Sequence, residues 1–283
     1  MNRRMNLSRA LVPASVGTVA AAAVAVVMLA AAVVPGWLAP FDPLAIDPAA
    51  AFEPPSAAHW LGTDESGRDT YSRIVHGARE SLVIGVAATG IGLGLALLLG
   101  VPAGLGAGGG AGGRRLDFGI GRLLEVLFAL PGLLLALVFI AFAGPGTGTA
   151  VVAVGLSTAP GYARIIRAQV AALRTSAMVE AAVVLGRSPA RVLVRHLLPN
   201  ALAPVMVLAT LGLGQAVVWA SALSFLGLGA PPPAPEWGAM LSAGRTYLGI
   251  AWWLTLFPGL AIVLVAASST MLGRALQRRA VGQ

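Results

Sequence analysis

Hydrophobic residues run through this chain in long blocks, and polar residues gather in short segments between them. Six blocks are long and apolar enough to cross about 30 Å of hydrocarbon, which takes about 20 helical residues. The fourth is the shortest and contains Pro160, so we expect its helix to borrow length from the residues that flank it. The pattern predicts an all-α polytopic membrane protein with six transmembrane helices, at residues 11–34, 81–105, 120–143, 147–163, 201–226 and 252–273.

The first block allows two interpretations. Arg3, Arg4 and Arg9 precede it and small residues follow it, as they do in a signal peptide. Its apolar stretch is longer than the usual signal-peptide core of about 7–15 residues. We therefore expect a retained anchor, so that residues 1–35 form a cytoplasmic N-terminus and the first transmembrane helix.

Arginine is distributed unevenly among the polar segments. If the N-terminus is cytoplasmic, only Arg68, Arg73, Arg79 and Arg245 of the 19 basic residues lie outside. The others lie inside: Arg3, Arg4, Arg9, Arg114, Arg115, Arg122, Arg164, Arg167, Arg174, Arg187, Arg191, Arg195, Arg274, Arg278 and Arg279. This bias matches the positive-inside rule for membrane proteins.

The same sidedness divides the rest of the chain into three parts. Residues 36–80 form an extracytoplasmic segment, and residues 81–273 form a five-helix core. A cytoplasmic loop at 164–200 interrupts that core, and residues 274–283 form a cytoplasmic tail. Both termini are then expected on the cytoplasmic side.

Composition agrees with a membrane protein and excludes several other classes. The 283 residues are 57% hydrophobic and 11% charged, whereas a soluble domain has about 25% charged residues. The net charge of +8 follows from the topology, so we expect no nucleic-acid partner. The chain has no cysteine, and its three histidines lack metal-ligand spacing. It has no lysine, so it cannot form the P-loop of a nucleotide-binding protein, which requires one. We therefore expect no cofactor, metal or enzymatic activity in this chain.

Glycine marks positions where helices can approach closely and where the chain can turn. Gly90 and Gly94, and likewise Gly100 and Gly104, have the four-residue spacing of closely packed membrane helices. The run GLGAGGGAGG at 104–113 contains the pattern G-x-G-x-x-G, but no strand precedes it. We therefore expect a pliable cytoplasmic turn there and no dinucleotide site.

The cytoplasmic segment EAAVVLGRSPARVLVRHLLPN, residues 180–200, combines helix signals with charge. Thr175 or Ser176 is placed to cap a first helix, and Gly186 stands where a helix end accepts a positive φ. Ser188 followed by Pro189 predicts the start of a second helix, which we expect Pro199 to close. The segment therefore predicts two helices joined by a tight glycine turn.

Arg187, Arg191 and Arg195 recur every four residues, so they lie near one side of the second helix. Two interpretations remain open. The arginines can neutralise lipid phosphates and hold the loop inside. Alternatively, they belong to a docking element for a partner with a receptive groove.

The order of residues in this segment resembles the EAA signature of ABC importer permeases. Glu180-Ala181-Ala182 is followed after three residues by Gly186 and, nine residues later, by HLLP at 196–199. His196 departs from the signature, which prefers isoleucine there. The stretches LGTDESGRDTYSR, ALPGLLLAL, PGYARIIRAQV, RHLLPNALAPV, SFLGLGAPPPAPEWGAML and LFPGLAIVL also look like segments of the dipeptide/oligopeptide (and nickel) permease family, specifically its second permease subunit. The similarity covers about residues 55–272, and the tail departs from the family at Arg274.

The resemblance implies a type I ABC importer permease fold in a bacterial inner membrane. It implies that this chain forms half of the translocation pathway of an ATP-driven importer for di- or oligopeptides. The expected partners are a second homologous permease subunit, two ATP-binding subunits that hold ATP and Mg, an extracytoplasmic solute-binding protein and the lipid bilayer. The expected coupling residues to the ATPase are Glu180, Ala181, Ala182, Gly186, Arg187, Arg191, Arg195, Leu198 and Pro199.

Several alternatives stay open beside this interpretation. A permease for nickel or another small solute has a similar sequence, whereas a self-sufficient channel or secondary transporter belongs to another class. The spans lack the deep ionisable residues that a secondary transporter usually uses.

Two charged positions also allow alternatives. Glu125 either snorkels to the interface or faces a cavity. Arg68, beside Asp64 and Asp69, forms either a local salt-bridged loop or, with Gly67 and Trp237, a contact to the partner permease or binding protein.

Overall fold

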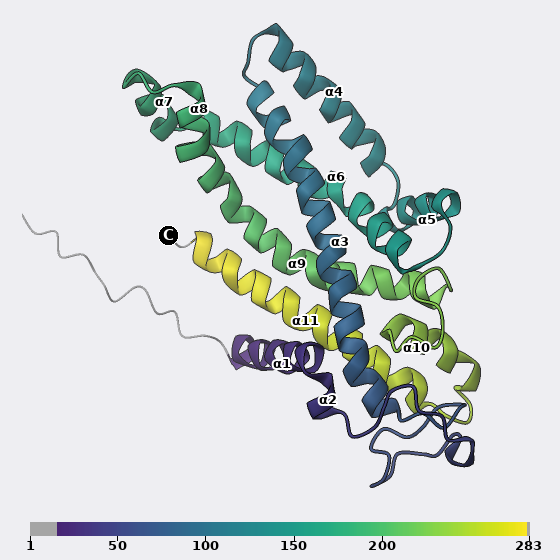
Figure 1. Cartoon of the computed structure of the whole chain (residues 1–283). Helices are drawn as coiled ribbons and strands as arrows, with labels where there is room; N and C mark the ends of the chain where they lie inside the picture. The colour runs from purple at the N-terminus through teal and green to yellow at the C-terminus, as the bar shows by residue number, and fades with distance from the viewer. Residues whose placement is uncertain (1–15, 282–283) are drawn as a thin grey trace, which may run out of the picture.

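The computed structural model describes residues 16–281, and helices account for most of them (Figure 1). No strand is present in this range, apart from one isolated bridge between Thr63 and Asp69. The helices are α1 (Val16–Val33), α2 (Pro35–Leu38), α3 (Thr70–Gly106), α4 (Ala111–Phe128), α5 (Gly132–Ala143), α6 (Thr147–Arg174), α7 (Ala177–Val184), α8 (Pro189–Val192), α9 (Leu198–Phe225), α10 (Trp237–Gly244) and α11 (Trp253–Val281). Short 3-10 turns occupy Pro48–Ala50 and Arg245–Tyr247, and a π turn occupies Leu193–Leu197. Arg3, Arg4 and Arg9 lie outside the described residues.

Five of these helices are long and apolar enough to cross a membrane, and a bent pair makes a sixth candidate. The span expected at 120–143 is not one straight helix, because α4 and α5 meet at an angle of 91° across the break between them. Pro131 lies in this break; it disfavours helical geometry at Leu130 and cannot donate a backbone hydrogen bond. The sixth span is therefore two helices with different directions.

Two spans are longer than the hydrophobic pattern alone indicated. As expected, α6 borrows length from its flank: it runs through Pro160 and continues to Arg174, for 28 residues in all. The helix α3 begins at Thr70 rather than near residue 81, and it has 37 residues. Asp69 caps it, since its Oδ2 accepts a hydrogen bond of 2.8 Å from the backbone N–H of Ser72.

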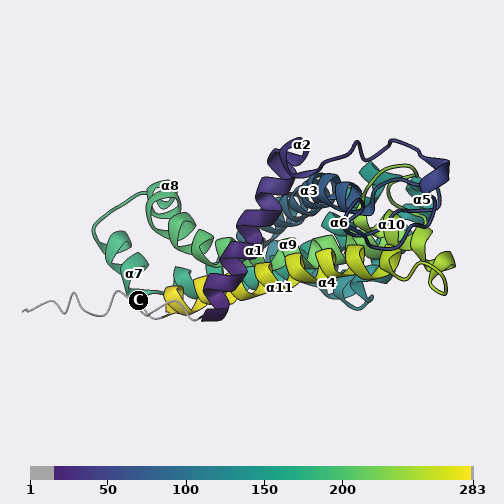
Figure 2. The same cartoon turned by 90° about the horizontal axis from the view of Figure 1, so that it is seen from below.

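The long helices run between two distinct ends of the molecule (Figures 1 and 2). One end holds the α3–α4 turn, the α7–α8 segment and the C-terminal end of α11; we call it the α7 end. The other end holds α10 and the irregular segment at 39–69; we call it the α10 end. The segments expected inside thus gather at one end, and the large segments expected outside gather at the other.

The helix α3 lies centrally and packs most closely against α6. A Cβ on Gly100 would lie 2.8 Å from the carbonyl oxygen of Ala163, and one on Gly104 would lie 2.7 Å from that of Arg167. These two glycines therefore allow the backbones to approach, as their spacing predicts. Gly90 and Gly94 have open space beside them in this chain, so the first glycine pair makes no such contact.

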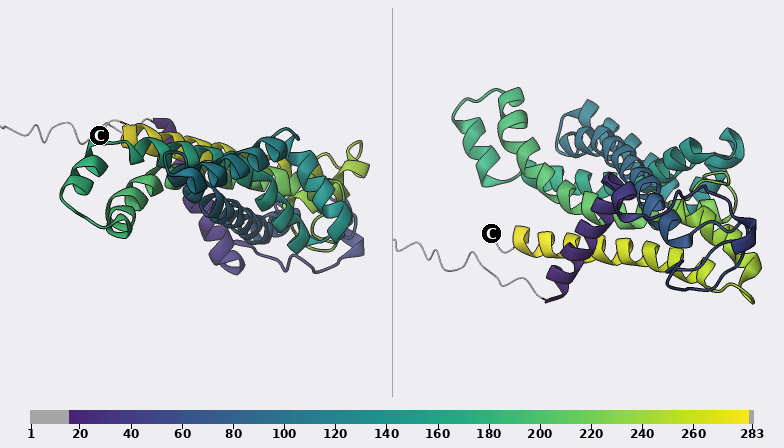
Figure 3. Two further views of the ribbon diagram at one scale, coloured as in Figure 1. Left: turned by 90° about the horizontal axis from the view of Figure 1, so that it is seen from above. Right: turned by 60° about the horizontal axis from the view of Figure 1, so that its bottom comes forward.

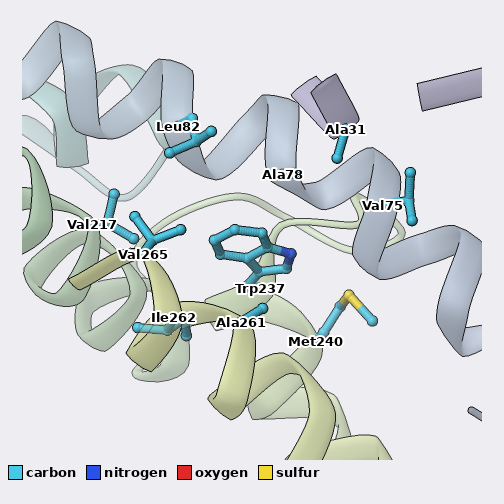
Figure 4. Packing of buried hydrophobic residues seen from close by; sticks show 10 residues of the cluster. All are labelled: Ala31, Val75, Ala78, Leu82, Val217, Trp237, Met240, Ala261, Ile262 and Val265. Carbon is cyan, nitrogen blue, oxygen red and sulfur yellow. The ribbon is translucent and has the colours of Figure 1, made fainter. Parts of the chain in front are cut away.

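A second packing centre fixes α10 and α1 to the bundle (Figure 4). The indole of Trp237 is fully buried there, with Ala31 of α1 and Val75 of α3 in the same cluster. Ala261 and Ile262 of α11 complete the cluster on the other side. The helix α1 crosses α11 and exposes most of its apolar surface, as a lipid-facing span does (Figure 3).

Candidate functional site: the segment between α6 and α9

The segment between α6 and α9 starts from a fixed point at the α7 end. Arg174, the last residue of α6, donates two hydrogen bonds to the α3–α4 connection. Its Nη1 lies 2.5 Å from the carbonyl oxygen of Leu105, and its Nη2 lies 2.8 Å from that of Gly108. The glycine-rich turn is thereby held against the point where the polypeptide leaves the bundle.

The short helix α7 follows directly and packs through one face. Ser176 stands at its N-cap in an extended conformation, but its hydroxyl donates to the carbonyl oxygen of Leu173 and does not cap α7. Val179 and Ala182 are buried against Val192 and Leu197 of the following turns. Glu180 lies in the first turn and is exposed, where a carboxylate favours the positive end of the helix dipole.

Gly186 ends α7 in the way that its sequence position predicts. Its φ is +70°, and its backbone N–H donates to the carbonyl oxygen of Val183 at 2.9 Å. The N–H of Arg187 reaches back to the carbonyl oxygen of Ala182 at 3.1 Å. These two bonds form a Schellman motif, which satisfies carbonyls left free at the helix end. A Cβ at Gly186 would meet nothing within 4 Å, so backbone conformation alone requires glycine here.

The second helix begins as expected and ends differently. Ser188 occupies its N-cap and Pro189 its first turn. The expected closure at Pro199 is wrong, because the helix continues through a π turn at Leu193–Leu197 directly into α9. A proline ring normally collides with the carbonyl four residues earlier, and the wider π turn before Pro199 accommodates it. The second helix is thus continuous with a 28-residue membrane helix.

The outer surface of this segment combines exposed apolar side chains with arginines. Val184, next to the glycine turn, is 87% exposed, and Leu185 and Val194 are also largely exposed. Arg191 and Arg195 are exposed and Arg187 is half-buried; none of the three forms an ion pair with any described residue. Figures 2 and 3 show α7 and α8 standing away from the helical bundle. Together they present an accessible apolar and basic surface.

The residues singled out at the α10 end are engaged within the chain. Arg68 Nε lies 2.7 Å from Asp64 Oδ2, and its Nη2 lies 3.0 Å from Glu65 Oε1. Asp69 caps α3 and also contacts His59 Nδ1 at 2.9 Å. This geometry supports the local salt-bridged loop for Arg68. Contact of this segment with a partner remains a prediction.

Gly67 and Trp237 likewise have internal roles. Gly67 has a φ of +73°, and a Cβ there would overlap the carbonyl oxygen of Asp47. The indole Nε1 of Trp237 donates to the carbonyl oxygen of Ile74 at 3.0 Å. Trp237 therefore shapes the surface of the α10 end without forming part of it.

Sequence reasoning missed one buried carboxylate at this end. Glu236 is 1% exposed and accepts hydrogen bonds from the backbone N–H groups of Gly238 and Ala239, both at 2.9 Å. It thereby caps α10. Aspartate, asparagine or serine is the usual N-cap residue, so a glutamate after the proline run did not predict the start of a helix.

No group of three or more metal-ligating side chains occurs among the described residues. A cavity of about 20 Å³ beside Asp64, Arg73 and Leu254 has room for about one water molecule. It is too small for a peptide or another organic solute.

Comparison with protein families defines the class. A family described as "Binding-protein-dependent transport system inner membrane component" matches residues 100–282. The matched range contains the α6–α9 segment and most of the bundle. The chain belongs to this family, and it is accordingly a multi-pass permease component of an inner-membrane transport system.

Individual relatives narrow the class further. The chain is 40% identical to the dipeptide transport system permease protein DppC of Alkalihalophilus pseudofirmus, over 82% of this chain and 74% of that protein. It is 38% identical to the probable D,D-dipeptide transport system permease protein DdpC of Escherichia coli K12, over 90% and 84%. It is 41% identical to the glutathione transport system permease protein GsiD of Shigella flexneri, over 91% and 83%.

Solved structures confirm the fold. A chain of the MetNI methionine ABC transporter in an inward-facing conformation superposes with a TM-score of 0.61, over 73% of this chain and 95% of that one. The sequence identity is 20%, so this likeness concerns the fold alone. The expected all-α ABC importer permease fold is confirmed.

Proposed function

We propose that this chain forms half of the translocation pathway of an ATP-driven importer for di- or oligopeptides. The peptide cargo rests on the relatives, three of which are named for dipeptide, D,D-dipeptide and glutathione transport. The half-pathway rests on membership of the permease-component family and on relatives that are each named as a permease protein of a transport system. A second homologous permease subunit supplies the other half.

The observation that carries the coupling role is the protruding α7–Gly186–α8 segment. Its exposed apolar and basic surface fits a receptive groove on an ATP-binding subunit. We assign the coupling role to Glu180, Ala181, Ala182, Gly186, Arg187, Arg191, Arg195, Leu198 and Pro199. Ala182 contributes indirectly, since its side chain is buried beneath the turn and its carbonyl oxygen accepts the hydrogen bond from the N–H of Arg187. Two ATP-binding subunits carry ATP and Mg, so hydrolysis takes place outside this chain.

The continuity of the second helix with α9 explains how movement would reach the pathway. A force applied to the segment after Gly186 acts on a helix that runs without a break from Pro189 to Phe225. At the same time, Arg174 links the base of the segment to the α3–α4 turn. Closure of the ATP-binding pair would therefore tilt α9 and α3 together and switch the bundle between inward-open and outward-open states.

The grouping of segments at the two ends supports the proposed sidedness. The α7 end, with its arginines, faces the cytoplasm and the ATP-binding subunits, and both termini lie on that side. The α10 end faces the extracytoplasmic solute-binding protein that delivers cargo. The apolar surfaces of α1 and the outer helices face lipid.

Transport by the reconstituted complex tests the cargo assignment. Proteoliposomes that contain both permeases, both ATP-binding subunits and the binding protein would be supplied with a panel of di-, tri- and tetrapeptides and with nickel chelates. ATP-dependent uptake of peptides is expected. Uptake of nickel chelates without uptake of any peptide would instead support the related small-solute permease.

A further inference from the structure

Gln215 is the only amide side chain in the six apolar spans of this sequence. It lies in α9, well inside the membrane-spanning part of the helix. The hydroxyls of Thr210 and Thr270, two other span residues, donate to carbonyls of their own helices. The amide of Gln215 is exposed and has no hydrogen-bond partner among residues 16–281.

The neighbours of Gln215 define the direction in which it points. Successive residues of an α-helix point about 100° apart. Gly214 faces α11, since a Cβ there would lie 3.1 Å from the Cα of Ala266. Ala216 faces the opposite flank and is buried in a cluster with Ala136 of α5 and residues of α6. Gln215 therefore projects between α5 and α11, where the described part of the chain leaves it exposed.

An open stripe runs along α9 through this position. Leu211, Gln215, Val218, Ala222 and Leu226 follow helical spacing and are half-buried or exposed. From residue 211 to 226 the stripe is about 22 Å long at 1.5 Å per residue, which matches about six or seven residues of extended peptide. It contains no charged side chain, so it favours no particular charge on what passes along it.

Lipid is a poor neighbour for this stripe, because an amide without partners is costly in hydrocarbon. A primary amide carries both donor and acceptor groups and can pair with a peptide N–H or C=O, whatever the side chains of the peptide are. We propose that Gln215 lines the translocation pathway and hydrogen-bonds the backbone of the passing peptide. This inference rests on the proposed function and names a residue that recognises the peptide class.

Transport and cysteine accessibility test the inference in the complete reconstituted complex. Trialanine is the probe, because its side chains offer no polar group. Gln215→Leu is expected to lower kcat/KM for trialanine about tenfold, the worth of one lost hydrogen bond, and Gln215→Asn to retain part of the activity. Met206→Leu is the matched control: Met206 is 67% exposed and lies nine residues away, on the opposite side of α9. Trialanine import by the Gln215→Leu complex equal to that of the unmodified complex would overturn the inference.

The chain has no cysteine, so an introduced one can be assigned to its position within this subunit. In Gln215→Cys, a water-soluble thiol reagent is expected to modify the subunit during turnover, and saturating trialanine to slow this modification several-fold. Met206→Cys should remain unmodified in lipid. Modification of Gln215→Cys that is absent, or insensitive to trialanine, would overturn the inference, as would its crosslinking to the partner permease in every nucleotide state. Failure of the unmodified complex to import any peptide would instead contradict the proposed function.

Discussion

Arg167 Nε lies 2.6 Å from Asp117 Oδ1, so an ion pair joins α6 to α4 near the α7 end. The two side chains are 31% and 17% exposed, respectively. A second ion pair on α4, between Arg122 and Glu125, is 2.8 Å long but has side chains 66% and 57% exposed. The first pair connects two helices across partly desolvated space, whereas the second stays on one helix surface. The two ion pairs should therefore contribute differently to the stability of the folded chain.

Asp117→Ala is expected to lower stability by about 1–2 kcal/mol, because it leaves a half-buried guanidinium without its partner. The midpoint of thermal unfolding of the purified protein would report the loss as a decrease of a few degrees. Glu125→Gln is the matched control. It should change the free energy of unfolding by less than about 0.5 kcal/mol and leave assembly and transport unaltered. Equal losses in the two variants would contradict the assignment of Arg167–Asp117 as the tie between α4 and α6.

Gly186→Val is expected to abolish stimulation of ATP hydrolysis by the loaded binding protein while membrane insertion remains normal. A β-branched residue is strongly disfavoured at a φ of +70°, so the turn would open and misplace the arginines that follow it. Gly186→Asn should retain much of the stimulation, because asparagine tolerates this conformation. The ATPase rate of the reconstituted complex is the measurement. Normal stimulation in the valine variant would remove the coupling assignment.

Arg68→Ala is expected to destabilise the α10 end by on the order of 3 kcal/mol, since the buried carboxylate of Asp64 loses its 2.7 Å partner. Arg73, at 3.6 Å, can replace only part of that interaction. Glu65→Gln should have little effect, because Glu65 is partly exposed and only the second partner of Arg68. Limited proteolysis of residues 39–69 offers a local readout. Unchanged protection in Arg68→Ala would argue against the buried pair.

Trp237→Ala is expected to lower stability by about 3–5 kcal/mol, because it empties the centre of a buried cluster. Trp237→Phe keeps most of the packing and loses the bond to Ile74, at a cost of about 1 kcal/mol beyond any repacking. Trp37→Ala, at a side chain 89% exposed, is the control. The thermal-unfolding midpoint should be lowest for Trp237→Ala, higher for Trp237→Phe and highest for Trp37→Ala. A Trp237→Ala variant as stable as the Trp37 control would contradict the packing described for α10.

Local signals in the sequence were sufficient to locate the apolar blocks of the spans and the glycine turn at Gly186, but not the bounds of α3 or the break between α4 and α5. The Schellman motif at Gly186 and the start at Ser188-Pro189 depend on neighbouring residues, so sequence position alone predicts them. The extension of α6 beyond its apolar block was also expected. By contrast, Pro131 bends the α4–α5 pair sharply, while Pro199 is passed through a π turn. Proline thus bends the chain at one position and is accommodated within a helix at the other, because the neighbouring turns and packing differ.

Contacts between distant residues could not be predicted from the sequence. Arg174 and Leu105 are 69 positions apart, and Arg167 and Asp117 are 50 apart. The sequence predicts all three charged residues for the cytoplasmic side, and the structure brings them together near the α7 end, but their pairing could not be read from the sequence. Likewise, Arg68 has its partners within four positions, so a local loop was foreseen, whereas the burial of Trp237 depends on α1, α3 and α11.

Peptide uptake into proteoliposomes tests the central claim most directly: this chain translocates only as a permease half that separate ATP-binding subunits drive. Vesicles holding this chain alone should take up no peptide, with or without ATP. Vesicles holding both permeases and both ATP-binding subunits, supplied with the binding protein, should accumulate peptide only when ATP is present. Uptake by this chain alone, or uptake by the full complex without ATP, would contradict the account and point to a self-sufficient channel or secondary transporter.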